Sequence, residues 1–225
     1  MLLAVDIGNT NIVLGVLDGE NLVYSGRFST HIHQTVEECA MNLYSFLNIH
    51  SIGKIDGAII SSVVPALVST VKGAVKLVTG VHALVVGPGI KTGLSIKIDD
   101  PAQLGADLVV GAVAAKEKYS QPTIIFDLGT ATTGTVLDKD GCCIGGMIAA
   151  GVKSSINALS TGTAQLPQID ISAPKKIIGT NTIDCMKSGT VIGTAVMIDG
   201  FVERFEDELG EKATVVVTGG LGKAI

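Results

Sequence analysis

The apolar and polar residues alternate in blocks that predict short buried strands and amphipathic helices along the whole chain. A nearly continuous apolar run, LLAVDIG at 2–8, predicts a strand buried on both faces. The next run, NIVLGVLDGENLVYSGRF at 11–28, predicts a hairpin that turns at Asp18-Gly19. Apolar residues then recur at helical spacing between Gln34 and Leu47, and DGAIISSVV at 56–64 predicts another strand.

The same kind of pattern continues after this strand. Pro65 suits the first turn of a following helix, and ALVVG at 83–87 predicts a short strand. A further helix is predicted to begin at Asp100-Pro101 and to run to Tyr119. Residues 182–209 predict one long helix with room for a break at 189–193, and ATVVVTGGLG at 213–222 predicts a strand that runs into a glycine-rich turn.

The strand pattern of the first half begins again at Gln121-Pro122. PTIIFDLGT at 122–130 ends in Asp-x-Gly, as LLAVDIG does, and a second meander follows with its turn at Asp140-Gly141. Asp6 lies 121 positions before Asp127, and the two Asp-Gly turns are 122 positions apart. This spacing predicts a structural duplication, with one hairpin loop from each half facing a common cleft.

The predicted fold is therefore α/β, with two lobes of mixed sheet around a central nucleotide cleft, which is the duplicated actin-like ATPase (ribonuclease H-like) fold. Residues 1–118 form the predicted N-terminal lobe, with the first phosphate loop and the acceptor carboxylate. Residues 119–225 form the predicted C-terminal lobe, with the second phosphate loop, the adenosine side and a long helix.

Composition narrows the function. A net charge of −5 leaves no electrostatic footprint for nucleic acid, and the chain has no basic amphipathic segment for a membrane surface. Charge, glycine or polar residues interrupt every apolar run, so we expect no transmembrane helix, and no basic region precedes the first apolar run as in a signal peptide. Four cysteines without a CxxC pair predict reduced thiols in a cytoplasmic protein.

The Asp-x-Gly loops have the chemistry that ATP transfer needs. Asp6 can hold Mg2+, usually through water, and Gly8 lets the backbone approach a phosphate closely. The N–H groups of Asn9, Thr10 and Asn11 can donate to phosphate oxygens. One such loop more often only terminates a strand in a tight turn, but two loops in equivalent places favour the nucleotide hypothesis. Neither a P-loop, nor a GxGxxG after the first strand, nor a GxSxG elbow occurs.

Two further features are ambiguous on pattern alone. Asp107 lies near the start of a predicted apolar helix, where it can accept a hydroxyl proton or simply stabilise its own helix as a first-turn acid. Gly219-Gly220 suits a flat surface against an adenosine, although a Gly-Gly turn after a strand is also a common connection.

The motifs in their order resemble those of type III pantothenate kinases over essentially the whole chain. They are DIGNTN (6–11), ISSVVP (60–65), GPGIKTGL (87–94), DP-x-x-LGAD (100–107), DLGTATT (127–133), GGMIAAGV (145–152), GTNT (179–182) and VVTGGLG (216–222). The resemblance implies the actin-like fold and ATP-dependent phosphorylation of pantothenate at its terminal hydroxyl, the first step of coenzyme A synthesis. It also implies a homodimer.

The resemblance further implies a role for each matching residue. Asp107 would be the proton acceptor, and Asp127 would bind a monovalent cation, potassium or ammonium, in addition to the Mg2+ near Asp6. The ATP contacts would be Asp6, Ile7, Gly8, Asn9, Thr10, Asn11, Ile12, Val13 and Thr130, and the pantothenate contacts would be Gly105, Ala106, Asp107, Leu108 and Thr182.

Two departures from the family pattern leave alternatives open. Leu108 stands where the family commonly has arginine, and Lys91 or Lys97 could substitute for the missing cation. Family members usually continue past the TGGL motif, whereas this chain ends at Ile225, so we expect it to lack the usual C-terminal segment. The alternatives are a catalytically weak nucleotide-binding regulatory paralogue and a kinase or phosphatase of the same fold that acts on another acceptor.

Overall fold

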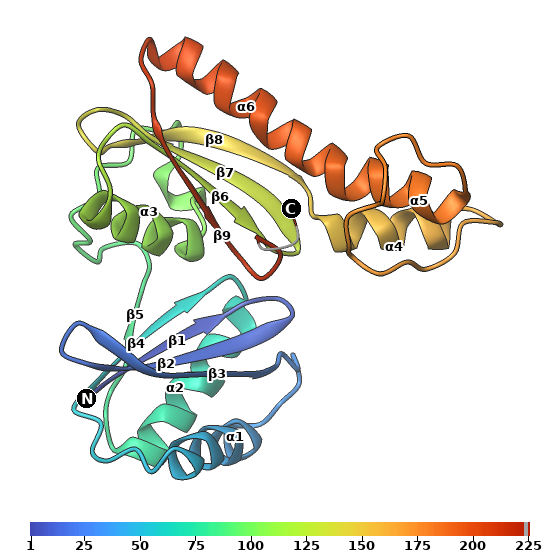
Figure 1. Ribbon diagram of the computed structural model, residues 1–225. Coiled ribbons are helices and arrows are strands. Elements are labelled where there is room, and N and C mark those ends of the chain that lie inside the picture. Colours follow the sequence, from blue (N-terminus) through green and yellow to red (C-terminus); the bar gives the residue numbers. More distant parts are fainter. Residues whose placement is uncertain (223–224) are drawn as a thin grey trace. The chain divides into compact units, whose positions relative to one another are not determined.

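The chain forms two compact units. The computed structural model describes residues 1–222 and 225 (Figure 1). Unit 1 comprises Met1–Lys91 and Ala102–Val110, and unit 2 comprises Thr92–Pro101 and Gly111–Ile225. The boundary between Val110 and Gly111 divides the helix Ala106–Lys118, which the sequence analysis placed entirely in the first lobe. The lobe boundary at residue 118 stays a prediction.

Unit 1 is built on a five-stranded mixed sheet of order β3-β2-β1-β4-β5. β1 pairs antiparallel with β2 and parallel with β4, so its two neighbours come from a hairpin and from a helical crossover. β1 is fully apolar on one face, where Leu3, Val5 and Ile7 are buried. The strands β1 to β5 span Leu2–Ile7, Asn11–Asp18, Asn21–Ser29, Gly57–Ser62 and Leu84–Val85.

Helices α1 (Val36–Ile49) and α2 (Pro65–Thr79) cover this sheet and pack with it into one apolar core. α1 begins with a capping box, in which the Thr35 hydroxyl accepts from the Glu38 N–H and the Glu38 carboxylate accepts from the Thr35 N–H. α2 begins at Pro65, as the sequence predicts, and is capped by Gly80 at φ 74°.

Unit 2 repeats the arrangement with a four-stranded sheet of order β8-β7-β6-β9. β6 pairs antiparallel with β7 and parallel with β9, as β1 pairs with β2 and β4. The predicted duplication is thus present in the strand topology. The strands β6 to β9 span Thr123–Leu128, Ala131–Leu137, Cys143–Ala150 and Thr214–Thr218.

The long helical segment of unit 2 contains a break. α5 (Thr182–Lys187) leads into a π-helical turn at Ser188–Ile192, and α6 continues over Gly193–Leu209. The Thr190 hydroxyl donates to the Met186 carbonyl, 2.7 Å away, which competes with regular backbone bonding in this turn. α6 packs Phe201 and Phe205 against the core cluster that includes Phe126 of the sheet, and Figure 1 shows it along one face of that sheet.

Two helix predictions need correction. The helix expected from Asp100-Pro101 is instead a 3-10 turn at Pro101–Gln103 followed by α3 (Ala106–Lys118). α3 begins directly after Gly105, whose carbonyl accepts the N–H of Val109 at 3.0 Å. The sequence interpretation also missed α4 (Val152–Gly162), although its buried Val152 and Ile156 have helical spacing.

Candidate functional site

The first Asp-x-Gly loop has a backbone shape held by hydrogen bonds on both sides. The Gly8 N–H donates to the Asn11 carbonyl at 3.0 Å and closes the turn between β1 and β2. The Thr30 hydroxyl donates to the Gly8 carbonyl at 2.7 Å, and the Thr30 N–H donates to the Thr10 carbonyl at 3.0 Å. Asn9 and Thr10 are exposed at the tip. The loop is therefore a preformed surface of polar groups beside the end of β1.

The apolar members of the predicted ATP-binding run divide between core and surface. Ile7 and Ile12 pair across β1 and β2, and both are completely buried. Only their backbone groups can therefore face a ligand. Val13 pairs with Asp6 and is 42% exposed, so it shares the face of the sheet that carries the carboxylate.

Asp6 lies beside a hydroxyl and a second carboxylate. Its register partner on β4 is Ser61. Desolvation by its surroundings raises the pKa of the Asp6 carboxyl, the Ser61 hydroxyl lowers it, and the negative charge of Asp107 raises it further. The net effect is a pKa above the ordinary value of 3.8. Unit 1 thus brings together Asp6 and Asp107, two residues singled out from distant motifs.

Gly105 makes room for the Asp107 carboxylate. A Cβ atom at position 105 would lie 2.5 Å from Asp107 Oδ1, so a side chain there would force the carboxylate to move. The same oxygen accepts from the N–H of Leu108 at 2.8 Å in the first turn of α3. Asp107 and Leu108 are both half-buried. The glycine and the helix start therefore hold this carboxylate in place.

Of the two lysines named as substitute cations, Lys97 is engaged in an ion pair. Lys97 donates to Asp138 at 3.0 Å in unit 2, and this contact is the main cause of a raised pKa of Lys97 and also lowers the pKa of Asp138. Lys91 is exposed in unit 1.

The second Asp-x-Gly loop is closed by a corresponding hydrogen bond that spans one residue fewer. The Gly129 N–H donates to the Ala131 carbonyl at 3.0 Å. The Thr130 carbonyl accepts from the Ser154 hydroxyl at 2.7 Å and from the Gly151 N–H at 3.2 Å. Two hydrogen bonds from the start of α4, a helix that the sequence analysis missed, thus hold the Thr130 carbonyl.

Asp127 lies between two threonines and under a glycine turn. Its register partners are Thr133 on β7 and Thr218 on β9. Gly219 has φ 93°, and a Cβ atom there would lie 2.5 Å from Asp127 Oδ1. The close approach that this glycine permits is therefore to the Asp127 carboxylate. Its predicted contact with adenosine stays a prediction.

Both repeated aspartates have a buried hydroxyl without a partner on a neighbouring strand. Among the described residues, buried side-chain atoms that lack a hydrogen-bond partner occur at Gln34, Ser61, Gln121, Thr132 and Thr133. Ser61 is the register partner of Asp6, and Thr133 is that of Asp127. An oxygen atom left unpaired beside a carboxylate suits a hard cation. Among the described residues, no group of three or more His, Cys, Asp or Glu is placed to hold a metal ion.

Thr182 stands at the first turn of α5, in unit 2. The preceding Asn181 caps this helix, with its side-chain oxygen accepting from the Asp184 N–H at 2.9 Å. Lys187 holds the segment before the helix through Asp170 at 2.8 Å, a contact that lowers the pKa of Asp170 to about 2. The exposed Thr182 therefore lies in a first helical turn that the Asn181 cap and the Lys187–Asp170 ion pair stabilise.

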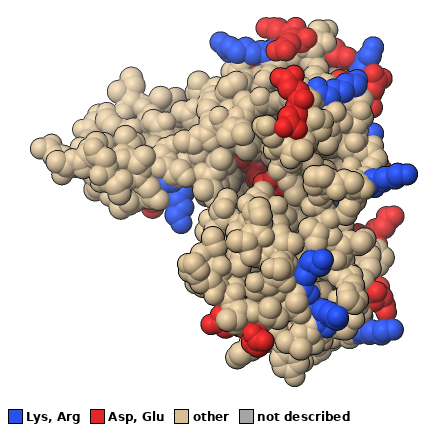
Figure 2. Space-filling model, turned by 180° about the vertical axis from the view of Figure 1, so that it is seen from behind, with Lys and Arg blue, Asp and Glu red and all other residues tan. Residues whose placement is uncertain are grey.

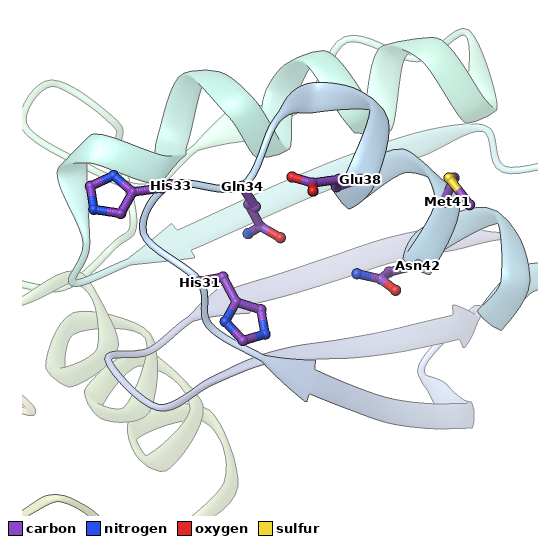
Figure 3. Close-up of a pocket in the computed structure, with 6 residues that line it drawn as sticks. All are labelled: His31, His33, Gln34, Glu38, Met41 and Asn42. Atoms are coloured by element: carbon purple, nitrogen blue, oxygen red, sulfur yellow. The ribbon is translucent and has the colours of Figure 1, made fainter.

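A separate cavity of about 470 Å³ lies in unit 1 at the start of α1. Figure 3 shows Gln34, Glu38 and Asn42 directed toward one another across it, with His31 on the adjoining loop. Glu38 already accepts from the Thr35 N–H in the capping box. The residues lining this cavity are His31, His33, Gln34, Glu38, Met41 and Asn42. None of them is a predicted site residue.

Known proteins similar to this chain agree on one family. The family model for type III pantothenate kinase matches residues 2–204. A type III pantothenate kinase of an Exiguobacterium species is 44% identical over all of this chain and 89% of its own length. One from Syntrophus aciditrophicus is 43% identical with the same coverage.

Solved structures with low sequence identity share the fold. The activator of 2-hydroxyisocaproyl-CoA dehydratase from Clostridium difficile, solved with ADPNP, has a TM-score of 0.54 at 13% identity and covers 99% of this chain and 81% of its own. A ROK hexokinase from Thermus thermophilus has a TM-score of 0.50 at 10% identity, with 99% and 84% coverage. The duplicated α/β architecture is thus the actin-like ATPase fold.

Proposed function

This chain belongs to the type III pantothenate kinase family, and from that membership we propose that it transfers the γ-phosphoryl group of ATP to pantothenate. The product would be 4'-phosphopantothenate, in the first step of coenzyme A biosynthesis. The observation that carries this proposal is the place of Gly105 and Asp107 in unit 1. A Cβ atom at Gly105 would lie 3.8 Å from Val63, whose N–H donates to the Ile7 carbonyl at 3.0 Å, so the start of helix α3 lies near the first phosphate loop.

In the proposed reaction the terminal hydroxyl of pantothenate attacks the γ-phosphorus in line. A bond forms from the hydroxyl oxygen to phosphorus as the bond to the β–γ bridging oxygen breaks, and that electron pair leaves with ADP. Asp107 accepts the hydroxyl proton. Thr130 and the N–H groups of residues 8–11 donate to phosphate oxygens, while Gly105, Leu108 and Thr182 contact pantothenate.

Asp6 would hold Mg2+ through water, and Asp127 would hold potassium or ammonium. These cations neutralise phosphate charge when bound. The orphaned hydroxyls of Ser61 and Thr133 support this assignment, since each lies beside one of the two aspartates.

Leu108 favours a second candidate function. The family's arginine at this place would add a charge-assisted contact worth about 1.5–3 kcal/mol, or roughly ten- to a hundredfold in affinity. A chain without it could bind nucleotide as a regulatory protein with weak turnover, or act on another acceptor. This candidate predicts binding of an ATP analogue without pantothenate-dependent release of ADP.

A cytoplasmic homodimer is part of the proposal. Within the 28-residue helical segment Thr182–Leu209, an 18-residue window has a mean hydropathy of 1.2 and is 22% buried, so by length and composition alone the segment could also cross a membrane. Its apolar side chains pack on the sheet at Phe201 and Phe205 but leave Val196 63% exposed. Ile178, just before α5, is 83% exposed, and Figure 2 shows few charged side chains at this end of unit 2, at the left.

The direct test is ADP release coupled to a spectroscopic readout, with and without pantothenate and with potassium replaced by sodium. The proposal expects turnover that needs both pantothenate and potassium. Nucleotide binding without turnover would instead support the regulatory candidate. Light scattering of the wild type and of Ile178→Glu tests the homodimer, which predicts a halved mass in the variant.

A further inference from the structure

We propose that Ser61 and Thr133 complete the two cation sites, with Ser61 orienting the Asp6 carboxylate toward the Mg2+–nucleotide and Thr133 giving an oxygen to the monovalent cation beside Asp127. The inference rests on the proposed function and extends it to two residues of neighbouring strands. Ser61 is assigned to the Mg2+ site alone and Thr133 to the monovalent-cation site alone. Loss of the Ser61 hydroxyl should therefore change only the dependence on divalent metal, and loss of the Thr133 hydroxyl only the dependence on potassium.

The case for Ser61 begins with its position in the sheet. It is 7% exposed and lies directly opposite Asp6 in the parallel pair β1–β4, so both side chains stand on the same face. Its buried hydroxyl has no hydrogen-bond partner within the described chain. A small rotation would let the hydroxyl donate to one carboxylate oxygen and leave the other for a water of the Mg2+ shell.

Thr133 has the corresponding place in unit 2, on the other side of its aspartate. It is the antiparallel partner of Asp127, and its buried hydroxyl likewise lacks a partner among the described residues. Thr218 flanks Asp127 on the opposite strand. In unit 1 the position equivalent to Thr133 is Val13, which has no oxygen.

This difference between the units agrees with the cations proposed for them. Mg2+ is reluctant to lose its water and needs few direct protein ligands. Potassium is bound where several oxygen atoms replace its hydration shell, which the carboxylate of Asp127 and a neighbouring hydroxyl help to do. Gly219 leaves the space open, because any side chain there would meet Asp127 Oδ1.

Two adjacent residues supply matched controls. Ser62 follows Ser61 on the opposite face of β4, and its hydroxyl already accepts from the Val64 N–H at 3.0 Å. Thr132 precedes Thr133 and also has an orphaned hydroxyl, but it pairs with the buried Leu128 and is itself fully buried. Loss of either hydroxyl affects packing without touching an aspartate.

The first experiment compares Ser61→Ala with Ser62→Ala. Binding of Mn2+ to the ADP complex, followed by electron paramagnetic resonance, should weaken about five- to tenfold in Ser61→Ala only. The Mg2+ concentration for half-maximal turnover should rise by the same factor, and the potassium requirement should not change. Ser61→Thr, which keeps a hydroxyl, should restore both values.

The second experiment compares Thr133→Val with Thr132→Val. The rise in melting temperature that potassium produces over sodium, at equal ionic strength with ADP bound, should shrink in Thr133→Val only. Its potassium concentration for half-maximal turnover should rise about five- to tenfold with Mn2+ binding unchanged, and Thr133→Ser should recover the wild-type value.

Equal behaviour of Ser61→Ala and Ser62→Ala would overturn the assignment of Ser61, and equal behaviour of the two threonine variants would overturn that of Thr133. If the wild type phosphorylates pantothenate and the Ser61 and Thr133 variants keep its cation requirements, this inference is refuted and the proposed function stands. A wild type that binds Mn2+ and ADP without phosphorylating pantothenate would refute the function, while the binding measurements still decide on Ser61. Absence of Mn2+–ADP binding in the wild type would refute both.

Discussion

The two Asp-x-Gly hairpins have the same strand topology and different surroundings. In unit 1, Ile7 pairs with Ile12, and in unit 2 Leu128 pairs with Thr132, which makes the second loop one residue shorter. Asp6 has the carboxylate of Asp107 nearby, whereas Asp127 stands between two threonines under a glycine turn. The duplicated backbone thus presents an aspartate at the same place twice, and its neighbours determine what each aspartate can bind.

The largest effect is expected at Asp107, the carboxylate whose negative charge acts on Asp6. Asp107→Asn keeps the shape of the side chain and removes its ability to accept a proton. We expect turnover to fall by about 10²–10⁴-fold with nucleotide affinity retained. The coupled ADP assay together with ADP titration calorimetry measures both, and wild-type turnover in this variant would remove Asp107 as the base.

Gly105 tests whether the placement of that carboxylate matters apart from its chemistry. Gly105→Ala forces Asp107 Oδ1 away from its position, and we expect turnover to fall about ten- to a hundredfold. Gly111→Ala in the same helix is the control, because a Cβ there meets nothing within 4 Å. A similar loss in both variants would mean that helix α3, not the carboxylate, is responsible.

Gly219 offers the equivalent test in unit 2. Gly219→Ala places a methyl group against Asp127 at a left-handed backbone position, so we expect the potassium concentration for half-maximal activity to rise about tenfold. Gly220→Ala is the matched control, since its Cβ would be in open space. An unchanged potassium requirement in Gly219→Ala would contradict a cation site at Asp127.

The smallest expected effect is on stability. The folded-state pKa of Asp6 is raised above 3.8, so stability from this group is present below that pH and is lost as the pH rises through the folded value. Asp6→Asn cannot ionise, and we therefore expect its melting temperature to lie slightly above that of the wild type at neutral pH. The difference should disappear toward pH 3.8, and calorimetry across this range would detect the opposite trend if the surroundings favour the carboxylate.

Prediction from the sequence succeeded where the signal is local. The repeated strand, Asp-x-Gly and hairpin were readable because apolar runs, Asp-Gly turns and their spacing lie within short segments. α4 was missed because it begins at a glycine without a side-chain cap, and the start of α3 was placed too early because Pro101 opens only a 3-10 turn.

The amino-acid order by itself determined the duplicated α/β architecture and the two aspartates that end β1 and β6. Only the tertiary structure decided that Ser61 stands beside Asp6, Thr133 beside Asp127, and Gly105 beneath Asp107. Alternation along a strand reveals which face a residue occupies, whereas its neighbour on the next strand depends on register, which the packing of the whole sheet sets.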